Sequence, residues 1–189
     1  MKRIVTLSVA AAIALSVGGL AGRATAQSPA RAPSLAVTLG FIRDKIAEQG
    51  RLAYASTTRD SANGQTWDNQ FTVEASNAAR DDGDCSVGFH WRSTVDGKPA
   101  QDLDVHIPFK IVTSVSISSM DDDVARLNAG GGHSGWVTQI RPPIWVLLLH
   151  RSDGHTNTVD FADRDMAERV AKAMRHAADL CGGAASLPF

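Results

Sequence analysis

The residues whose types and spacing could most readily support binding or catalysis lie in the glycine-rich segment Gly130–Gly135, which also contains a histidine and a serine. Three of its glycines satisfy the spacing G-x-G-x-x-G, but a dinucleotide site needs this loop between a strand and a helix. The residues that follow are strand-like. Ser134 partly matches the nucleophile of G-x-S-x-G, although Trp136 replaces the last glycine and no alternating α/β pattern surrounds it. We therefore predict a flexible hairpin loop here, without a catalytic residue.

The six histidines are the next candidates, because imidazole is the commonest metal ligand. None is spaced as H-x-x-x-H or H-E-x-x-H, so no helix presents two of them to one metal ion. His150 and His155 flank the turn at Asp153, and adjacent strands would bring them close. With His133 and nearby aspartates they would form a metal-assisted hydrolytic site. We keep a small hydrolase as the alternative function, but assign no metal ligand and no cofactor.

Two of the four tryptophans, Trp67 and Trp136, stand beside predicted loops, and His133 lies three residues before the second. Such side chains would line an apolar surface for a protein, a peptide or a small apolar ligand. The other interpretation is that they simply pack under the loops. We select Trp67, His133 and Trp136 as the candidate ligand surface.

The chain has only two cysteines, Cys85 and Cys181, so one intramolecular pairing exists. Neither belongs to a C-x-x-C motif, which disfavours a redox site. In an oxidising compartment we expect a disulfide. The loop that it closes would stabilise the fold by about 4–5 kcal/mol in the chain-entropy model.

The first 26 residues predict export. Lys2 and Arg3 precede an uncharged apolar run from 4 to 20, and Ala24-Thr25-Ala26 supplies small residues for cleavage. Cleavage after Ala26 would leave 163 of the 189 residues, periplasmic or extracellular, with 16 of the 19 basic residues against all 20 acidic ones. The formal charge would change from −1 to −4. A mildly acidic surface without a basic run argues against nucleic acid as a partner.

The hydrophobic periodicity predicts a single α+β domain over residues 34–183, after a flexible leader at 27–33 and before a flexible tail at 184–189. Apolar residues recur at helical spacing in two segments, 34–50 and from 163 or 165 to 181, and the second helix is strongly amphipathic. Between them the period is two, which predicts about seven antiparallel strands in a bent sheet or partly open barrel. We expect two of these to be short strands, at 124–127 and 136–140, on either side of the glycine-rich loop.

This order of elements resembles the pleckstrin-homology-like superfold, in which seven strands form a bent barrel and a C-terminal helix closes one end. The resemblance covers about residues 51–181 and rests on strand order, the final hairpin and the last helix. Lipid-binding members carry clustered Lys and Arg in the first hairpin loop, whereas residues 57–66 here contain only Arg59. Phosphoinositide binding is therefore not implied. The layout also resembles that of uncharacterised exported bacterial proteins.

Together these patterns favour an exported, non-enzymatic binding or protein-interaction module stabilised by one disulfide. The alternative is the small periplasmic or secreted hydrolase built around the last hairpin. The binding module is favoured because the sequence contains no complete catalytic constellation. The fold resemblance does not decide between the two functions, because one fold can serve many functions.

Overall fold

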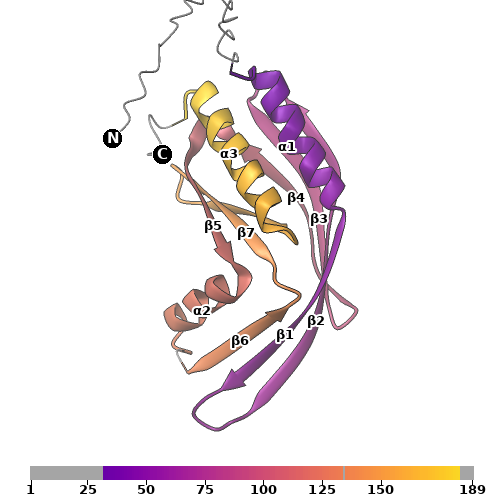
Figure 1. Ribbon diagram of the computed structural model, residues 1–189, viewed down its shortest axis with the longest axis vertical. Coiled ribbons are helices and arrows are strands. Elements are labelled where there is room, and N and C mark those ends of the chain that lie inside the picture. The colour runs from indigo at the N-terminus through magenta and orange to yellow at the C-terminus, as the bar shows by residue number, and fades with distance from the viewer. Residues whose placement is uncertain (1–31, 134, 184–189) are drawn as a thin grey trace, which may run out of the picture. The chain divides into compact units, whose positions relative to one another are not determined.

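The computed structural model describes residues 32–133 and 135–183. The predicted signal peptide, nearly all of the leader, Ser134 and the tail lie outside the described residues. The expected α+β fold is confirmed at the level of its class: the described residues form three α-helices and eight strands. Their arrangement is shown in Figure 1. In chain order the elements are α1 (Leu35–Gln49), β1 (Arg51–Asp60), β2 (Thr66–Asp81), β3 (Ser86–Val95), β4 (Lys98–Pro108), the 3-10 turn η1 (Phe109–Ile111), β5 (Val112–Ser119), α2 (Met120–Gly130), β6 (Trp136–Arg141), β7 (Trp145–Arg151), β8 (Thr156–Phe161) and α3 (Arg164–Leu180).

The strands form two antiparallel sheets, where one bent sheet or partly open barrel was expected. The larger has the order β4-β3-β2-β1-β6, and the smaller has the order β5-β7-β8. The long β1–β2 hairpin extends beyond the other elements in Figure 1, and β6 pairs with the outer half of β1. Pro142 and Pro143 separate β6 from β7, so the chain passes from the larger sheet to the smaller one at that point.

The two predicted amphipathic helices are confirmed. Ser34 caps α1 by accepting a hydrogen bond from the Val37 amide, and Asp163 caps α3 by accepting one from the Met166 amide. The apolar face of α3 is fully covered, which explains its alanine content, because small side chains let the helix lie close to the strands. In Figure 1, α1 and α3 lie side by side.

The prediction of a strand at residues 124–127 is wrong, because these residues belong to α2. Ser119 caps this helix: its Oγ accepts a hydrogen bond from the Asp122 amide at 3.1 Å. Asp121, Asp122 and Asp123 fill the first turn, where the positive end of the helix dipole favours carboxylates. The glycine-rich loop consequently connects a helix to β6 and is not the loop of a hairpin.

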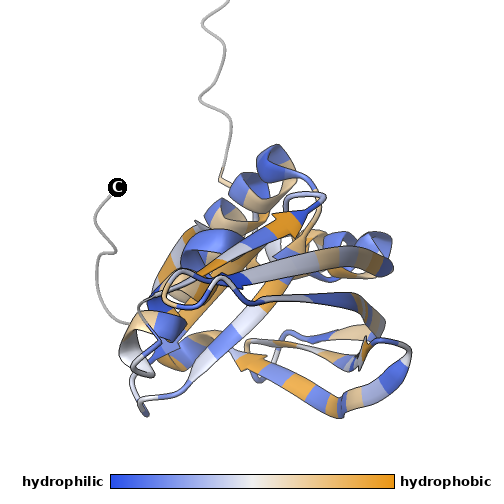
Figure 2. Ribbon diagram, turned by 90° about the horizontal axis from the view of Figure 1, so that it is seen from below, coloured by the Kyte–Doolittle hydropathy of each residue, from blue (hydrophilic) through white to orange (hydrophobic). Residues whose placement is uncertain are grey.

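Two buried clusters hold these layers together. The main core joins α1 and α3 to one face of each sheet, with Phe109 and Phe161 among its fully buried side chains. A smaller cluster lies between β1, β2 and the β6–β7 connection and contains Leu52, Tyr54, Val73, Ile140 and Ile144. Figure 2 shows hydrophobic and hydrophilic residues alternating along several strands, as expected when only one strand face is buried.

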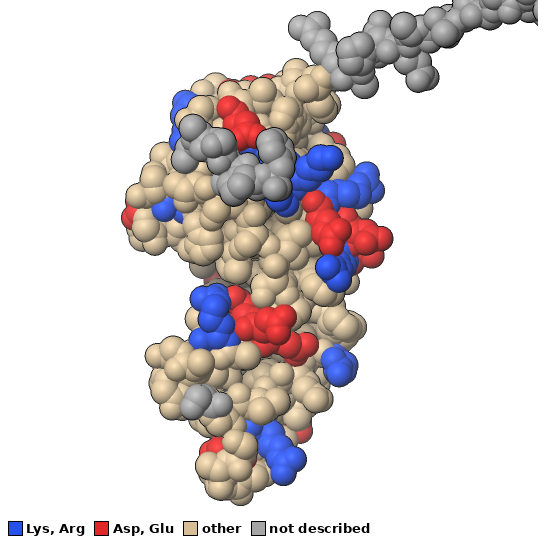
Figure 3. Space-filling model, turned by 60° about the vertical axis from the view of Figure 1, so that its left-hand side comes forward, with Lys and Arg blue, Asp and Glu red and all other residues tan. Residues whose placement is uncertain are grey.

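The expected disulfide is present between Cys85 and Cys181, with Cα atoms 5.9 Å apart. It connects the residue that precedes β3 to the C-cap of α3, across a sequence separation of 96. In the described part of the chain no helix is long and apolar enough to cross a membrane. On the face seen in Figure 3, acidic and basic side chains lie near one another and form no broad patch of one sign.

Candidate functional site

The structure brings together the three residues selected from the sequence as a ligand surface. The Trp67 and Trp136 ring centroids are 5.2 Å apart with the planes inclined at 43°. The His133 ring stacks on Trp136 at 4.1 Å, with 19° between the planes. These three rings come from β2, from β6 and from the loop after α2, and we call them the aromatic cluster.

Strand register explains why the two tryptophans meet. The strand β1 lies between β2 and β6, and it pairs Thr58 with Trp67 and Asp60 with Trp136. Because Thr58 and Asp60 are two residues apart, they point to the same face of the sheet, and so do their partners. The two rings therefore reach toward each other across β1.

The aromatic cluster lies outside both buried cores. Both tryptophans are half-buried, and His133 is exposed. On the same sheet face, the Thr58 and Thr138 hydroxyl oxygens are 2.9 Å apart and share a hydrogen bond. Asn69 is half-buried nearby in β2. Rings beside hydroxyl and amide groups form a surface that can hold an apolar ring and bind its polar substituents.

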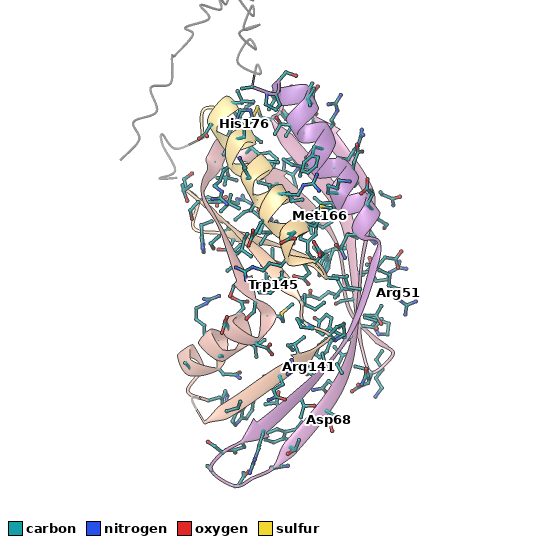
Figure 4. The ribbon with its side chains drawn as sticks, in the orientation of Figure 1. Arg51, Asp68, Arg141, Trp145, Met166 and His176 are labelled. Carbon is teal, nitrogen blue, oxygen red and sulfur yellow. A yellow bond between two sulfur atoms is a disulfide. The ribbon has the colours of Figure 1, made fainter. Side chains whose placement is uncertain are left out.

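The opposite face of the same strands carries an open depression of about 450 Å³ that the sequence did not indicate. Arg59 is the only charged residue in its lining, and Val137 is 59% exposed there. Asp68, which Figure 4 places near the end of the β1–β2 hairpin, accepts a hydrogen bond from the Thr57 hydroxyl at 2.6 Å. The exposed side chains of the hairpin end thus lie on this face, whereas those beside the aromatic cluster are half-buried.

The histidines of the hydrolase alternative are not arranged as a metal site. His150 Nδ1 lies 3.1 Å from the Thr156 hydroxyl, and the His155 amide donates to Asp153 within the turn. His133 is stacked on Trp136, away from this hairpin in the fold. Within residues 32–133 and 135–183, no three histidine, cysteine, aspartate or glutamate side chains are placed to hold a metal ion.

Another histidine has a defined chemical environment that sequence reasoning missed. His90 on β3 contacts Asp104 through Nδ1 and Asp102 through Nε2, each at 2.9 Å, on the exposed face of β3 and β4. The hydrogen bond to Asp104 and the nearby carboxylates raise the pKa of His90 above its ordinary value. The strand alternation placed His90 on a polar face, but only the β3–β4 register reveals its partners.

A buried carboxylate is the second feature that sequence reasoning missed. Asp160 on β8 is 7% exposed, although strand alternation would place it on the face opposite the buried Val159 and Phe161. Burial, followed by the negative charge of Asp123, raises the pKa of Asp160 to about 7. Among the residues that the structure describes, no hydrogen bond or positive charge lowers this pKa. The Asp160 side chain is buried because residues at the end of α1 and in β1, β2 and β3 surround it.

Tyr54 on β1 belongs to the same neighbourhood. Burial, followed by the charge of Asp160, raises the pKa of Tyr54 to about 12. Tyr54 also stacks on Phe71, with ring centroids 5.1 Å apart. Asp160 therefore lies near enough to Tyr54 to raise the pKa of its hydroxyl, and near enough to Asp123 for that carboxylate to raise the pKa of Asp160.

Comparisons of the chain with protein-family models, with curated proteins and with solved structures gave no match.

Proposed function

We propose that this chain is an exported, non-enzymatic binding module that uses the aromatic cluster to hold a peptide or a small apolar ligand. The observation that carries the proposal is the convergence of Trp67, His133 and Trp136 outside the cores. Partly exposed aromatic rings offer large contact areas at a small cost in conformational entropy, which suits them to ligand contacts. A phenyl or indole group would stack on the available ring faces.

Export is part of the proposal. It is supported by the basic start, the apolar run and the small residues ending at Ala26, and by the disulfide, which persists in oxidising compartments. The exported chain is expected to begin at Gln27, which its intact mass measures directly. A chain that keeps Met1–Ala26 would contradict export with cleavage at this site.

The pleckstrin-homology-like resemblance also stays a proposal. The antiparallel run from β1 to β4, the second sheet and the terminal helix α3 support it. The additional helices α1 and α2 and the pairing of β6 with β1 are features that the resemblance did not imply. No ligand class is transferred from that superfold to this chain.

Binding is tested by nuclear magnetic resonance, because the four indole N–H groups give four separate signals. Indole and short peptides that contain phenylalanine or tyrosine are the probes. We expect a binding probe to shift the signals of Trp67 and Trp136 and to leave that of Trp145 unchanged. Trp145 lies on the other sheet, under the Arg164 guanidinium at 4.9 Å.

The matched variants are Trp67→Ala and Trp136→Ala, with Trp145→Ala as the control. Loss of either ring of the aromatic cluster is expected to weaken binding about tenfold or more, because a stacked ring contributes both area and pair energy. The control is expected to bind as the parent protein does. The proposal fails when no probe shifts the two signals, or when the control loses affinity equally.

A further inference from the structure

The two edges of the larger sheet differ in what covers them. At β6, the Ile140 amide donates a hydrogen bond to Asp121 Oδ1 at 2.6 Å, and the Trp136 amide donates one to the His133 carbonyl at 2.9 Å. At the other edge, β4 pairs with β3 alone among the described strands, and residues 98–104 are all exposed. An edge strand whose amides and carbonyls have no partner can pair with a strand of another chain.

The register of β4 on β3 determines which backbone groups are free. The Phe109 amide donates to the Cys85 carbonyl at 2.9 Å, and the register from residue 101 to residue 108 has no shift. Because the bonds of an antiparallel ladder alternate, residues 103, 105 and 107 exchange hydrogen bonds with β3, and the amides and carbonyls of residues 102, 104 and 106 point away from it. Pro108 occupies the next outward position, where a missing N–H costs no bond to β3.

Charged side chains often prevent such pairing, but those of β4 are already balanced within the chain. Asp104 lies 2.9 Å from His90 Nδ1. Asp102 lies 2.9 Å from His90 Nε2 and 3.1 Å from Arg92 Nε. Both ring nitrogens of His90 therefore face a carboxylate, which favours the imidazolium, and the hydrogen bond to Asp104 raises the pKa of His90. Two cations thus offset the two carboxylates of the edge, so its charge does not repel a second strand of the same kind.

The free edge is complementary to itself when two copies run antiparallel about a two-fold axis at Asp104. Residues 102 and 106 then stand opposite each other in the two copies, so each outward amide meets an outward carbonyl. On the outer face, Asp102 of one copy stands opposite His106 of the other, which pairs a carboxylate with an imidazole. On the inner face, Leu103, which is 43% exposed, stands opposite Val105 of the other copy and gains an apolar neighbour.

The neighbouring registers are less favourable. An axis at Leu103 would place Asp102 of one copy opposite Asp104 of the other, and these are like charges. An axis at Val105 would place Asp102 opposite Pro108, which has no amide to donate. The axis at Asp104 does bring its two carboxylates together, but each lies beside the imidazolium of its own chain. The residues of the edge therefore favour one register.

We propose that this chain forms a homodimer through β4, in which the two five-stranded sheets join antiparallel about Asp104 into one continuous sheet. About six backbone hydrogen bonds would form at residues 102, 104 and 106. The helix α1 packs on β2 and β3, and none of the described helices packs along β4, so none stands between the two edges. An interface of this small size gives a weak dimer that depends on protein concentration.

The dimer is independent of the proposed ligand binding, but it would make that binding bivalent. The aromatic cluster belongs to β2, to β6 and to the loop after α2, and β6 is the edge opposite β4. Pairing through β4 therefore leaves both copies of the cluster open. Failure of probe binding would leave the dimer standing, and failure of the dimer would leave each chain with its own cluster.

The first test uses protein expressed from the full sequence and needs no variant. Its mass is measured by sedimentation equilibrium between about 20 μM and about 1 mM, and amide exchange is read residue by residue by nuclear magnetic resonance at both ends of this range. We expect the mass to rise toward twice that of one chain. The amides of residues 102, 104 and 106 are expected to exchange at least about fivefold more slowly at the higher concentration, and those of residues 103, 105 and 107 to exchange equally at both.

Asp104→Pro is the sharpest variant, because the amide of residue 104 points away from β3 and proline removes only the bonds to the second copy. It is expected to stay monomeric at about 1 mM. The matched control Asp104→Ala keeps the amide and removes the two facing carboxylates, so it is expected to dimerise at least as well as the parent protein. The unfolding temperature of each variant checks that the fold is kept.

The register is tested at residue 106. His106→Asp would oppose Asp102 of the second copy with a like charge and is expected to weaken the dimer about tenfold, whereas His106→Lys keeps an opposite charge and is expected to preserve it. Equal affinities of these two variants would overturn the register and, with it, the proposal.

The proposal is also overturned when the chain stays monomeric at about 1 mM, or when Asp104→Pro dimerises as the parent protein does. Loss of the dimer in Asp104→Ala has the same meaning. Outward amides of β4 that are already protected in the monomer would show that another segment of this chain occupies the edge, and that result excludes the dimer.

Discussion

Gly183 shows how closely the end of the chain's last helical turn approaches the rest of the fold. A β-carbon at this position would lie 2.8 Å from the Phe109 carbonyl oxygen and 3.0 Å from that of Ala178. Its amide donates a hydrogen bond to the same Ala178 carbonyl at 2.8 Å. Carbonyl oxygens of the backbone cannot move aside as a flexible side chain can, so only glycine fits here.

Gly183→Ala is therefore expected to lower the free energy of unfolding by about 1–3 kcal/mol, as overpacking usually does. Denaturant titration measures the loss. Gly130→Ala is the matched control: it lies at the end of α2, and nothing stands within 4 Å of its added β-carbon. A loss at Gly183 no larger than at Gly130 would show that the backbone there can relax.

Among the candidate site residues, sequence reasoning identified the aromatic cluster but missed the environments of Asp160 and His90. Tryptophans beside loops are visible in the sequence, and strand register then decides whether they meet. Asp160 and His90 are hidden for the opposite reason. Alternation places both on solvent-facing positions, and only the residues of other elements around the Asp160 side chain, or the pairing of β3 with β4, supply their neighbours.

At the level of helices and strands, prediction succeeded where one period persisted over a long segment. The helices α1 and α3 are of this kind. It failed at α2, which has 11 residues and a single buried residue, the polar Asp123. So little apolar periodicity cannot separate a helix from a strand, and the capping serine and three aspartates were the better signal.

The cap of α2 gives a direct test of this explanation. Ser119→Ala removes the hydroxyl that accepts from the Asp122 amide and donates to the Asp122 carboxylate at 2.6 Å. We expect a loss of about 1 kcal/mol. Amide exchange in residues 121–130 is expected to accelerate more than exchange in α3.

Ser116→Ala provides the comparison, because Ser116 is exposed in the middle of β5 and forms no helix cap. It is expected to leave exchange in α2 unchanged. Equal acceleration in both variants would mean that the serine hydroxyl does not determine where α2 begins.

The helix α2 also holds the edge strand β6, because Asp121 Oδ1 accepts a hydrogen bond from the Ile140 amide at 2.6 Å.

At the scale of the whole molecule, the disulfide is the covalent link between the larger sheet and α3. Replacing both partners, as Cys85→Ala with Cys181→Ala, is expected to lower the free energy of unfolding by about 4–5 kcal/mol, because the unfolded chain regains the entropy of an open loop. Thermal unfolding with and without reductant measures it. An unfolding temperature that reductant leaves unchanged would contradict this expectation, and the double variant should not respond to reductant.

The arrangement of the two sheets was the part of the fold least accessible from sequence. Each hairpin has local turn residues, such as Asn63-Gly64 and Asp96-Gly97, that predict which neighbours pair. The pairing of β6 with β1 joins segments about 80 residues apart and has no local signal. It depends on α2, which turns the chain back from β5 toward the larger sheet.

The position of the disulfide also determines how the chain would respond to a pulling force. Tension applied between residues 33 and 183 would pass from Cys85 through the sulfur atoms to Cys181, so residues 86–180 would bear none of it. Only α1, β1, β2 and the turn before Cys85 would extend, about 50 residues or roughly 180 Å of contour length. Under load the molecule would therefore act as a short extensible arm attached to a covalently closed, force-shielded body.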